Sequence, residues 1–158
     1  MKIVSGGQSG VDRAALDAAL AAGVPYGGWC PAGGWAEDFP EPPGLLAAYP
    51  ALRPTPSADP AERTAWNVRD SDRTLILLGA GGLAASPGTG LTRQLAEGRG
   101  RPTLVVDALA PDAAAAIRAW LADAPPGLVL NVAGPRESEA PGIYDAARAV
   151  MAAVLGTG

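Results

Sequence analysis

Histidine is absent from this sequence of 158 residues, and cysteine occurs only once, as Cys30. A Ser-His-Asp triad needs an imidazole base, a zinc cluster needs several histidine or cysteine ligands, and an internal disulfide needs a second thiol. These sites are excluded, so any chemistry rests on carboxylates, hydroxyls, arginines and backbone amides, and no metal ligands are predicted. Cys30 stands between Trp29 and Pro31 without a neighbouring cation, which predicts a small buried apolar residue rather than a nucleophile.

Positive charge and long apolar runs are also scarce. The formal net charge is −4, Lys2 is the only lysine, and the basic residues are scattered along the chain. Counterion release from a nucleic-acid backbone needs a basic stripe, so no nucleic-acid partner is expected. No apolar run approaches the roughly 20 residues of a membrane span, and the N-terminus lacks the charged and apolar regions of a signal peptide. We therefore expect a cytoplasmic protein with no membrane partner.

Short apolar runs alternate with helix-length segments rich in Ala, Leu and Arg, the order expected when each strand of a parallel sheet is followed by a crossover helix. Strands are predicted over residues 2–5, 26–30, 74–78, 103–107 and 128–132. Helices are predicted over residues 10–22, from residue 59 onward, and over 89–98, 112–123 and 142–155. The pattern indicates one α/β domain over residues 1–158, a Rossmann-like three-layer sandwich whose mainly parallel sheet has about five or more strands and helices on both faces.

The segment 31–60 interrupts this alternation. It is dense in proline, contains Trp35, Phe39 and Tyr49, and has no convincing periodicity for helix or strand. Long segments of this kind are lids, binding loops or oligomer contacts when they are ordered, and linkers when they are not. The aromatic residues favour an ordered loop or lid that covers a site.

A glycine-rich turn over residues 5–13 joins the first strand to the first helix and predicts an anion site. Glycines allow a ligand to approach the backbone, and unpaired amides at a helix N-terminus attract anions. The predicted ligand-binding residues here are Gly6, Gly7, Gln8, Ser9, Gly10, Asp12 and Arg13. A cation at Arg13 conflicts with the helix dipole unless an anion is bound; the alternative is a solvated Arg13 paired with Asp17. If the turn holds the anion, Gly7→Val blocks the ligand and leaves the fold intact.

Two further turns lie at the ends of later strands. Residues 79–90 contain glycines and lead through Gly88 and Thr89 into a helix, and residues 131–138 add Gly134, Arg136 and Ser138. Because the carboxyl ends of parallel strands lie at one edge of a sheet, these turns converge with the first. Asp107, at another strand end, either binds a ribose hydroxyl or is an ordinary cap or solvated acid.

The stretch 66–72 is dense in hydrogen-bonding groups just before an apolar strand. It contains Asn67, Arg69, Asp70 and Ser71. Two interpretations are equally supported: these side chains face a ligand, or they form a solvated helix end with Trp66 in the core.

Several blocks of the sequence match a known family. They are residues 5–17 (SGGQSGVDRAALD), 27–31 (GGWCP), 36–38 (AED), 63–72 (RTAWNVRDSD) and 131–138 (NVAGPRES). Together they resemble the putative molybdenum carrier proteins, a circularly permuted branch of the Rossmann-like superfamily that contains the LOG and lysine-decarboxylase-like proteins. The resemblance implies a homo-oligomeric carrier without catalytic residues. Its cargo would be the molybdenum cofactor, a phosphorylated pterin with a molybdenum oxo centre, or a molybdenum oxyanion such as molybdate.

The chain departs from the family pattern in two places. Ala32, Gly34 and Trp35 stand where the family usually has basic residues, and Pro87 replaces the first glycine of a Gly-Gly-Thr turn, which removes one amide donor.

The alternative function is that of a nucleotide-binding LOG-like protein, either a nucleoside-monophosphate phosphoribohydrolase or a nucleotide sensor. The LOG motif supplies a catalytic glutamate, but the alignment places Thr92 at that position. The other acids considered as substitutes are Glu37, Asp38, Asp70 and Glu137. A sensor would bind a nucleotide in the same crevice without catalysis.

Overall fold

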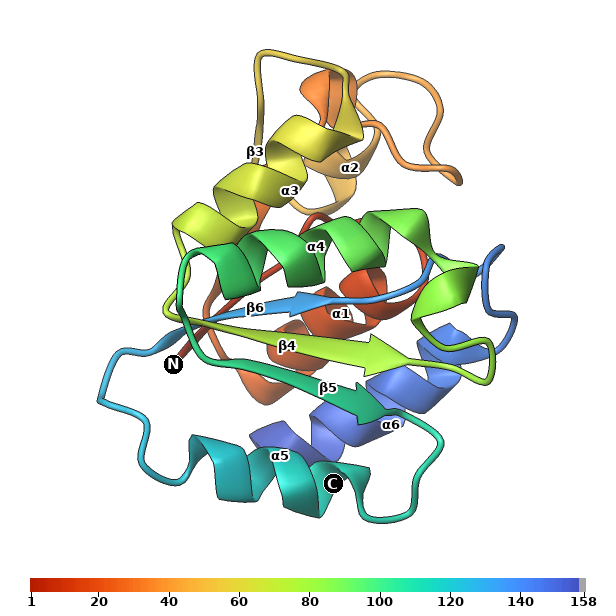
Figure 1. The fold of residues 1–158 in the computed structure, drawn as a ribbon. Coiled ribbons are helices and arrows are strands. Elements are labelled where there is room, and N and C mark those ends of the chain that lie inside the picture. The colour runs from red at the N-terminus through yellow and green to blue at the C-terminus, as the bar shows by residue number, and fades with distance from the viewer. Residues whose placement is uncertain (157–158) are drawn as a thin grey trace.

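A computed structural model of the chain describes residues 1–156 and contains one six-stranded sheet (Figure 1). All strand pairs are parallel, and the order across the sheet is β3-β2-β1-β6-β4-β5. The strands are β1 (Lys2–Val4), β2 (Tyr26–Cys30), β3 (Leu52–Pro54), β4 (Arg73–Leu78), β5 (Thr103–Asp107) and β6 (Val129–Ala133). The predicted Rossmann-like α/β fold with a parallel sheet is confirmed. The last two residues of the predicted domain, 157 and 158, lie outside the described residues.

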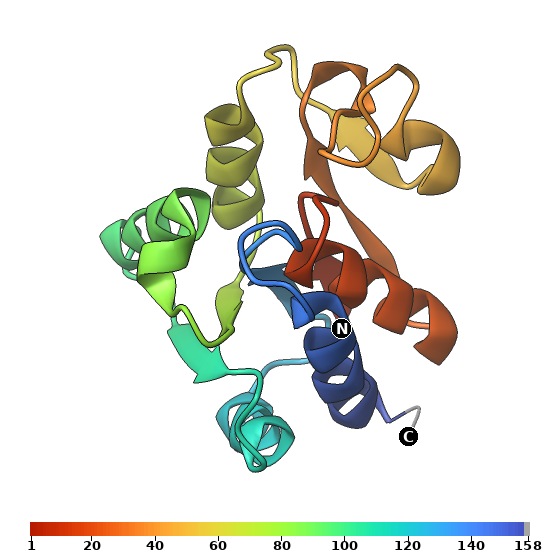
Figure 2. The ribbon, with the colours of Figure 1, turned by 90° about the vertical axis from the view of Figure 1, so that its right-hand side faces the viewer.

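Helices cover both faces of the sheet, which makes three layers (Figure 2). On one face lie α1 (Val11–Ala22), α5 (Ala113–Leu121) and α6 (Ile143–Leu155), and on the other lie α3 (Pro60–Arg69) and α4 (Pro87–Gly98). The short α2 (Leu45–Ala48) and the 3-10 turns η1 (Ala32–Gly34) and η2 (Leu83–Ala85) lie in connections. Each predicted helix is present, with start and end positions that differ from the prediction by one or two residues where both were predicted.

Two apolar clusters form the core. The larger lies between the sheet and α1, α5 and α6, and contains Leu75, Leu130 and Met151, which are fully buried. The smaller lies between α1, β2 and the segment after β2, and contains Leu16, Cys30, Ala36, Leu45 and Leu52. Cys30 is buried there as a free thiol, as predicted, and burial raises the pKa of the thiol.

The segment 31–60 has more regular structure than the sequence pattern suggested. It contains η1, α2 and β3, and β3 extends the sheet by pairing with β2, with Leu52 opposite Gly28 and Pro54 opposite Cys30. No periodic pattern in the sequence indicated these elements, and the role of the segment as a loop or lid over a site stays a prediction. A strand of three residues is too short for a period of two to be visible, and proline is tolerated at a sheet edge.

Side-chain caps explain where α3 and α4 begin. The Asp59 side chain accepts a hydrogen bond from the Ala61 amide, and the Ser86 side chain accepts one from the Thr89 amide. Proline occupies the first position of both helices, where no amide donor is needed. Both helix N-termini therefore have defined orientations at the carboxyl edge of the sheet.

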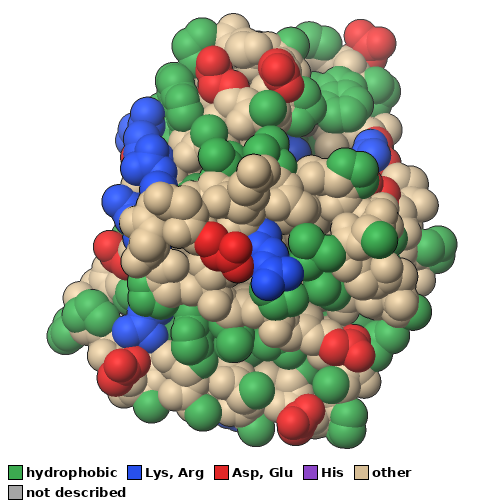
Figure 3. Space-filling model, in the orientation of Figure 1, with side chains coloured by type: hydrophobic (Ala, Val, Ile, Leu, Met, Phe, Trp, Pro, Cys, Tyr) green, Lys and Arg blue, Asp and Glu red, His purple; other side chains and the backbone are tan. Residues whose placement is uncertain are grey.

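The surface over α3 and α4 carries charged side chains of both signs, with Lys and Arg gathered at the left-hand edge beside α3 (Figure 3). Within residues 1–156, no helix has the length and the apolar character needed to cross a membrane.

Candidate functional site

A cavity of about 470 Å³ lies at the carboxyl edge of the sheet, near the starts of α3 and α4. The chain runs from β1 to β3 in one direction across the sheet and from β4 to β5 in the other, so the cavity lies where the strand order reverses. Ligands of open parallel sheets bind at such reversal points. The cavity is lined by the turn after β1, the starts of α3 and α4, and the segment between β6 and α6. Its polar lining residues are Gln8, Asp12, Asp59, Arg63, Thr64, Asn67, Ser86, Thr89, Thr92, Asn131, Arg136 and Glu139.

The N-terminus of α4 offers one open amide to this cavity. The Thr89 amide donates to Ser86, both to the carbonyl at 3.1 Å and to the side chain at 3.4 Å, and Pro87 has no amide to offer. The Gly88 amide has no hydrogen-bond acceptor among residues 1–156, and Gly88 lines the cavity. The first turn of a helix carries partial positive charge, so this amide is positioned to bind an anion.

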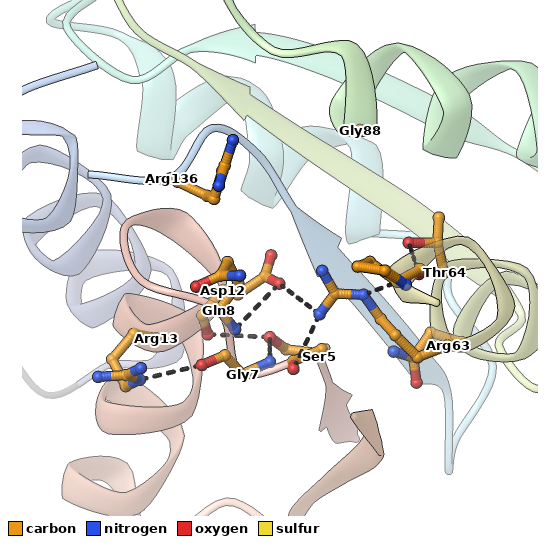
Figure 4. Close-up of polar contacts among 12 residues, drawn as sticks. Ser5, Gly7, Gln8, Asp12, Arg13, Arg63, Thr64, Gly88 and Arg136 are labelled. Carbon is orange, nitrogen blue, oxygen red and sulfur yellow. Dashed lines mark hydrogen bonds and ion pairs between the residues drawn. The ribbon is translucent and has the colours of Figure 1, made fainter. Parts of the chain in front are cut away.

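Two arginines reach the cavity from different segments. Arg63, on α3, donates from Nη1 to the Gly6 carbonyl at 3.0 Å, and the same atom lies 3.8 Å from Oδ2 of Asp12. Its side chain is only 11% exposed, whereas that of Arg136 is 41% exposed. Arg136 lies near Glu139, at 3.4 Å, and Glu37, at 3.5 Å. Figure 4 shows the Arg63 guanidinium beside Asp12, whereas Arg136 lies farther from it on the other side.

Two of the three acidic side chains that line the cavity, Asp12 and Glu139, differ in their protonation. Burial raises the pKa of Asp12 from 3.8 to about 6, although Arg63 and the Gln8 amide act in the opposite direction. Burial also acts against ionisation of Glu139, but hydrogen bonds from Arg136 and Ser86 hold the pKa of that carboxyl below its ordinary value. Glu139 is therefore a fixed negative charge at neutral pH, whereas the Asp12 proton is exchangeable in mildly acidic solution.

Most backbone amides of the glycine-rich turn before α1 already donate hydrogen bonds to acceptors within the turn or in α1. The Gly7 amide donates to Oγ of Ser5 at 3.2 Å, the Gln8 amide to Oδ2 of Asp12 at 3.4 Å, and the Ser9 amide to Oε1 of Gln8 at 3.0 Å. These internal acceptors occupy the positions that oxygens of a bound anion were expected to take (Figure 4). The turn therefore presents side chains rather than a row of free amides.

Arg13 is absent from the cavity lining. It makes a two-bond ion pair with Asp38, at 2.8 and 2.9 Å, and its Nε donates to the Gly7 carbonyl at 3.1 Å. Its guanidinium also lies over the rings of Phe39 and Tyr49. The alternative expectation, a solvated Arg13 paired with Asp17, does not agree with this geometry, because the partner is Asp38 and the pair joins α1 to the segment 31–60. The role of Arg13 as an anion ligand stays a prediction.

Gly7 is also absent from the cavity lining. Its φ is +74°, and a Cβ there would lie 3.0 Å from side-chain carbons of Leu45 and Leu52. Gly7→Val would therefore disturb the smaller core cluster, so it does not test ligand binding in the way that the sequence suggested.

Half of the predicted ligand-binding residues line the cavity: Gly6, Gln8, Asp12, Asn67, Gly88, Thr89, Gly134 and Arg136. The other half, Gly7, Ser9, Gly10, Arg13, Arg69, Asp70, Ser71 and Ser138, are not among its lining residues.

The residues outside the cavity make local contacts instead. Ser9 and Ser138 both donate to Glu37, Arg69 pairs with Asp70, and Ser71 donates to the Asn67 carbonyl. Gly10 packs against the Pro135 carbonyl, and Oδ1 of Asp107 accepts from the Leu109 amide. For the stretch 66–72, only Asn67 lines the cavity, and its amide group is bonded to the Trp29 backbone.

Sequence reasoning missed Arg63, Ser86 and Glu139 as cavity residues. Arg63 stands in a block that matches the known family, but nothing in its spacing separates it from a surface arginine in the first turn of a helix. Ser86 was visible only as a residue in a glycine-rich turn. Glu139 follows the block 131–138 by one residue and has no local signal of its own.

The fold and the cavity define a Rossmann-like α/β protein with a pocket at the carboxyl edge of a parallel sheet. The chain belongs to the circularly permutated YpsA SLOG family, whose model matches residues 3–155. It is also similar to a crystal structure of a putative molybdenum carrier protein from Syntrophus aciditrophicus SB, with 40% sequence identity and a TM-score of 0.85. That match covers 98% of this chain and 94% of the other. Among curated proteins, none matches the chain significantly. The family resemblance predicted from the sequence blocks is confirmed.

Proposed function

We propose that this protein is a molybdenum carrier that holds the molybdenum cofactor, or a molybdenum oxyanion, in the cavity between α3 and α4. The observation that carries the proposal is the open Gly88 amide at the N-terminus of α4, with Arg63 and Arg136 in the same cavity. Helix N-termini and arginines are the groups that bind phosphate and other oxyanions in proteins. The name of the similar crystal structure supports molybdenum as the element carried.

The cavity favours the cofactor over a bare oxyanion. Pockets that bury organic ligands have volumes of about 300–1,000 Å³, and the cavity here, at about 470 Å³, falls in that range. Molybdate would fill only a small part of it. Trp35, Leu91 and Val132 add apolar surface to the lining, which suits a planar ring better than an inorganic ion.

Nucleotide binding is the second candidate, and one observation favours hydrolysis in particular. Asp12 is a carboxylate in the cavity with a pKa of about 6, which suits a group that exchanges a proton near neutral pH. Thr92, at the position of the LOG glutamate, also lines the cavity, and its hydroxyl donates to the Gly88 carbonyl at 3.2 Å. In this alternative, Asp12 replaces the missing glutamate in cleavage of a nucleoside monophosphate.

A pair of glycine variants on one helix tests the proposal. A Cβ at Gly88 or at Gly98 meets no atom within 4 Å, and neither residue has a positive φ, so the backbone accepts a side chain at both. Gly88 lines the cavity, whereas Gly98, at the other end of α4, does not. We expect Gly88→Leu to lose its cargo while Gly98→Leu keeps it.

The measurement is metal analysis together with native mass spectrometry of both variants and the wild type, each purified from a host that makes molybdenum cofactor. The carrier proposal predicts molybdenum and a pterin mass in the wild type and in Gly98→Leu only. A wild-type protein without molybdenum contradicts it, and a bound nucleotide would favour the second candidate. The same spectra give the subunit number, which we propose to be that of a homo-oligomer.

A further inference from the structure

Asp12 has a free oxygen inside the cavity. Its side chain is only 10% exposed, and it lines the cavity at the N-terminus of α1. Oδ2 has two long contacts, 3.4 Å from the Gln8 amide and 3.8 Å from Nη1 of Arg63. Oδ1 has no donor among residues 1–156, and because no buried side-chain oxygen in this range lacks a partner, Oδ1 must be accessible from the cavity. Figure 4 shows the carboxyl group in the space bounded by Arg63, Arg136 and Gly88.

An ionised carboxylate at this point restricts which part of a ligand can lie beside it. A phosphate or molybdate oxygen in contact with Asp12 is repelled, whereas an N–H or O–H group gains a charge-assisted hydrogen bond. Charge-assisted bonds are normally about 2.7–2.9 Å long, so the present contacts of Oδ2 leave room for a better donor. The open amide of Gly88 favours the opposite charge. Glu139 is ionised nearby, but its charge is offset by Arg136, at 3.4 Å, and by the Ser86 hydroxyl, which donates to it at 2.9 Å.

We infer that the cavity binds its ligand in one orientation, with the anionic group at Gly88 and Arg136 and a neutral hydrogen-bond donor edge at Asp12. This inference rests on the proposed function, because it assigns the two ends of the same cavity. The donor edge that best fits a carboxylate is a ring N–H beside an amino group, since the two donors match the two oxygens. The 2-amino-4-oxopyrimidine edge of a pterin has this pattern, and so does that of guanine.

The surrounding charges set the pH range of this recognition. Arg63 from α3 faces Asp12 directly, Glu139 faces it from the segment before α6, and Arg13 on α1 itself is engaged by Asp38. Burial raises the pKa of Asp12 to about 6. The preference for a ligand with a donor edge should therefore be full well above pH 6. It should be lost as the pH falls below 6, because the protonated carboxyl no longer accepts two hydrogen bonds.

The test compares phosphorylated rings with and without the donor edge. The probes are 6-hydroxymethylpterin monophosphate, guanosine 5′-monophosphate, inosine 5′-monophosphate, which lacks the amino group, and inorganic phosphate. Calorimetric titration at pH 7.5 should show that the better of the two amino-bearing rings binds at least about tenfold more tightly than inosine monophosphate, the discrimination expected of one good donor–acceptor pair. Asp12→Asn should abolish this preference and leave the affinity for phosphate unchanged or higher.

Asp17→Asn is the matched control. It removes the same charge from the same helix, but Asp17 lies outside the cavity lining and accepts hydrogen bonds from Tyr49 and Tyr144. It should keep the amino-group preference of the wild type. Thermal melts of both variants establish that they are folded.

Two results would overturn the inference: amino-bearing rings that bind the wild type no better than inosine monophosphate, or an Asp12→Asn variant that keeps the preference. Tighter binding of the pterin would identify the pterin as the source of the edge, and tighter binding of guanosine monophosphate would identify a nucleotide. Either of these two results supports the inferred orientation of the ligand in the cavity. The probes contain no molybdenum, so this test and the metal analysis above can fail independently.

Discussion

The ion pair between Arg13 and Asp38 joins the start of α1 to the segment 31–60, so its removal should weaken the attachment of that segment. Changing Arg13 to methionine keeps an apolar stem of similar length and removes the guanidinium. The variant loses two hydrogen bonds to Asp38, at 2.8 and 2.9 Å, and one to the Gly7 carbonyl, at 3.1 Å. It also loses the contact of the cation with the Phe39 ring, whose centre is 4.9 Å away.

The size of the effect depends on how buried each partner is. The Arg13 side chain is 11% exposed, whereas that of Asp38 is 47% exposed and can regain water when its partner is removed. A hydrogen bond to a charged group contributes about 1.5–3 kcal/mol, and a fully exposed ion pair about 1 kcal/mol or less. Because Asp38 is rehydrated, we expect Arg13→Met to lower the free energy of unfolding by about 2–4 kcal/mol in all. For a chain of this length the melting temperature should fall by roughly 4–16 °C.

Urea denaturation of the wild type, Arg13→Met, Asp38→Asn and the double variant separates the pair from its surroundings. The coupling energy from this double-mutant cycle should be about 1.5–3 kcal/mol. Arg93→Met, which breaks the exposed pair with Glu97 on α4, is the control and should cost at most about 0.5 kcal/mol. A coupling energy of about 0.5 kcal/mol or less, no larger than the cost of the control variant, would refute the assignment of Arg13 as the residue that attaches this segment to α1.

Three further predictions concern stability. Burial raises the pKa of Asp12 from 3.8 to about 6, so the stability that the protonated carboxyl contributes is full below pH 3.8 and is lost as the pH rises to about 6. The free energy of unfolding of Asp12→Asn should therefore exceed that of the wild type by up to about 3 kcal/mol at neutral pH, but not at pH 4. Stability profiles of the two proteins that run parallel with pH would contradict this. Gly7→Val should lower the melting temperature, because residue 7 has a positive φ and its new side chain would contact Leu45 and Leu52 of the core. A melting temperature equal to that of the wild type would show that the turn can change its conformation to accommodate the side chain. Tyr49→Phe and Tyr144→Phe each remove a hydroxyl that donates to Asp17, and each should cost about 1.5–3 kcal/mol in urea unfolding, an effect that Asp17→Ala should abolish.

The sheet was predictable because most of its strands are apolar runs with clear flanking turns. Residues such as Leu75, Leu77 and Leu130 are completely buried, and continuous burial of this kind leaves a strong signal in the sequence. The edge strand β3 has no such signal, because Arg53 and Pro54 are exposed and only Leu52 faces the core. Its position is determined by pairing with β2, which is a tertiary interaction.

The site was predictable only where a turn follows a strand directly. Gly88, Thr89, Gly134 and Arg136 line the cavity because the ends of parallel strands converge there. Arg63 reaches the same cavity from α3, and its position depends on how that helix packs against the turn after β1. No local pattern in the sequence encodes this packing.

Glycine had two distinct roles that the sequence could not separate. In the first turn Gly10 is required by packing, because its φ is +79° and a Cβ there would lie 2.2 Å from the Pro135 carbonyl oxygen. A Cβ at Gly6 would lie 2.2 Å from Nη1 of Arg63 and would displace that side chain in the cavity. Gly10 is therefore necessary for the fold whether or not a ligand is present. A Cβ at Gly88 meets nothing within 4 Å, and its amide is the open donor of the cavity. Gly88 is therefore the position at which an added side chain should remove binding without removing the fold.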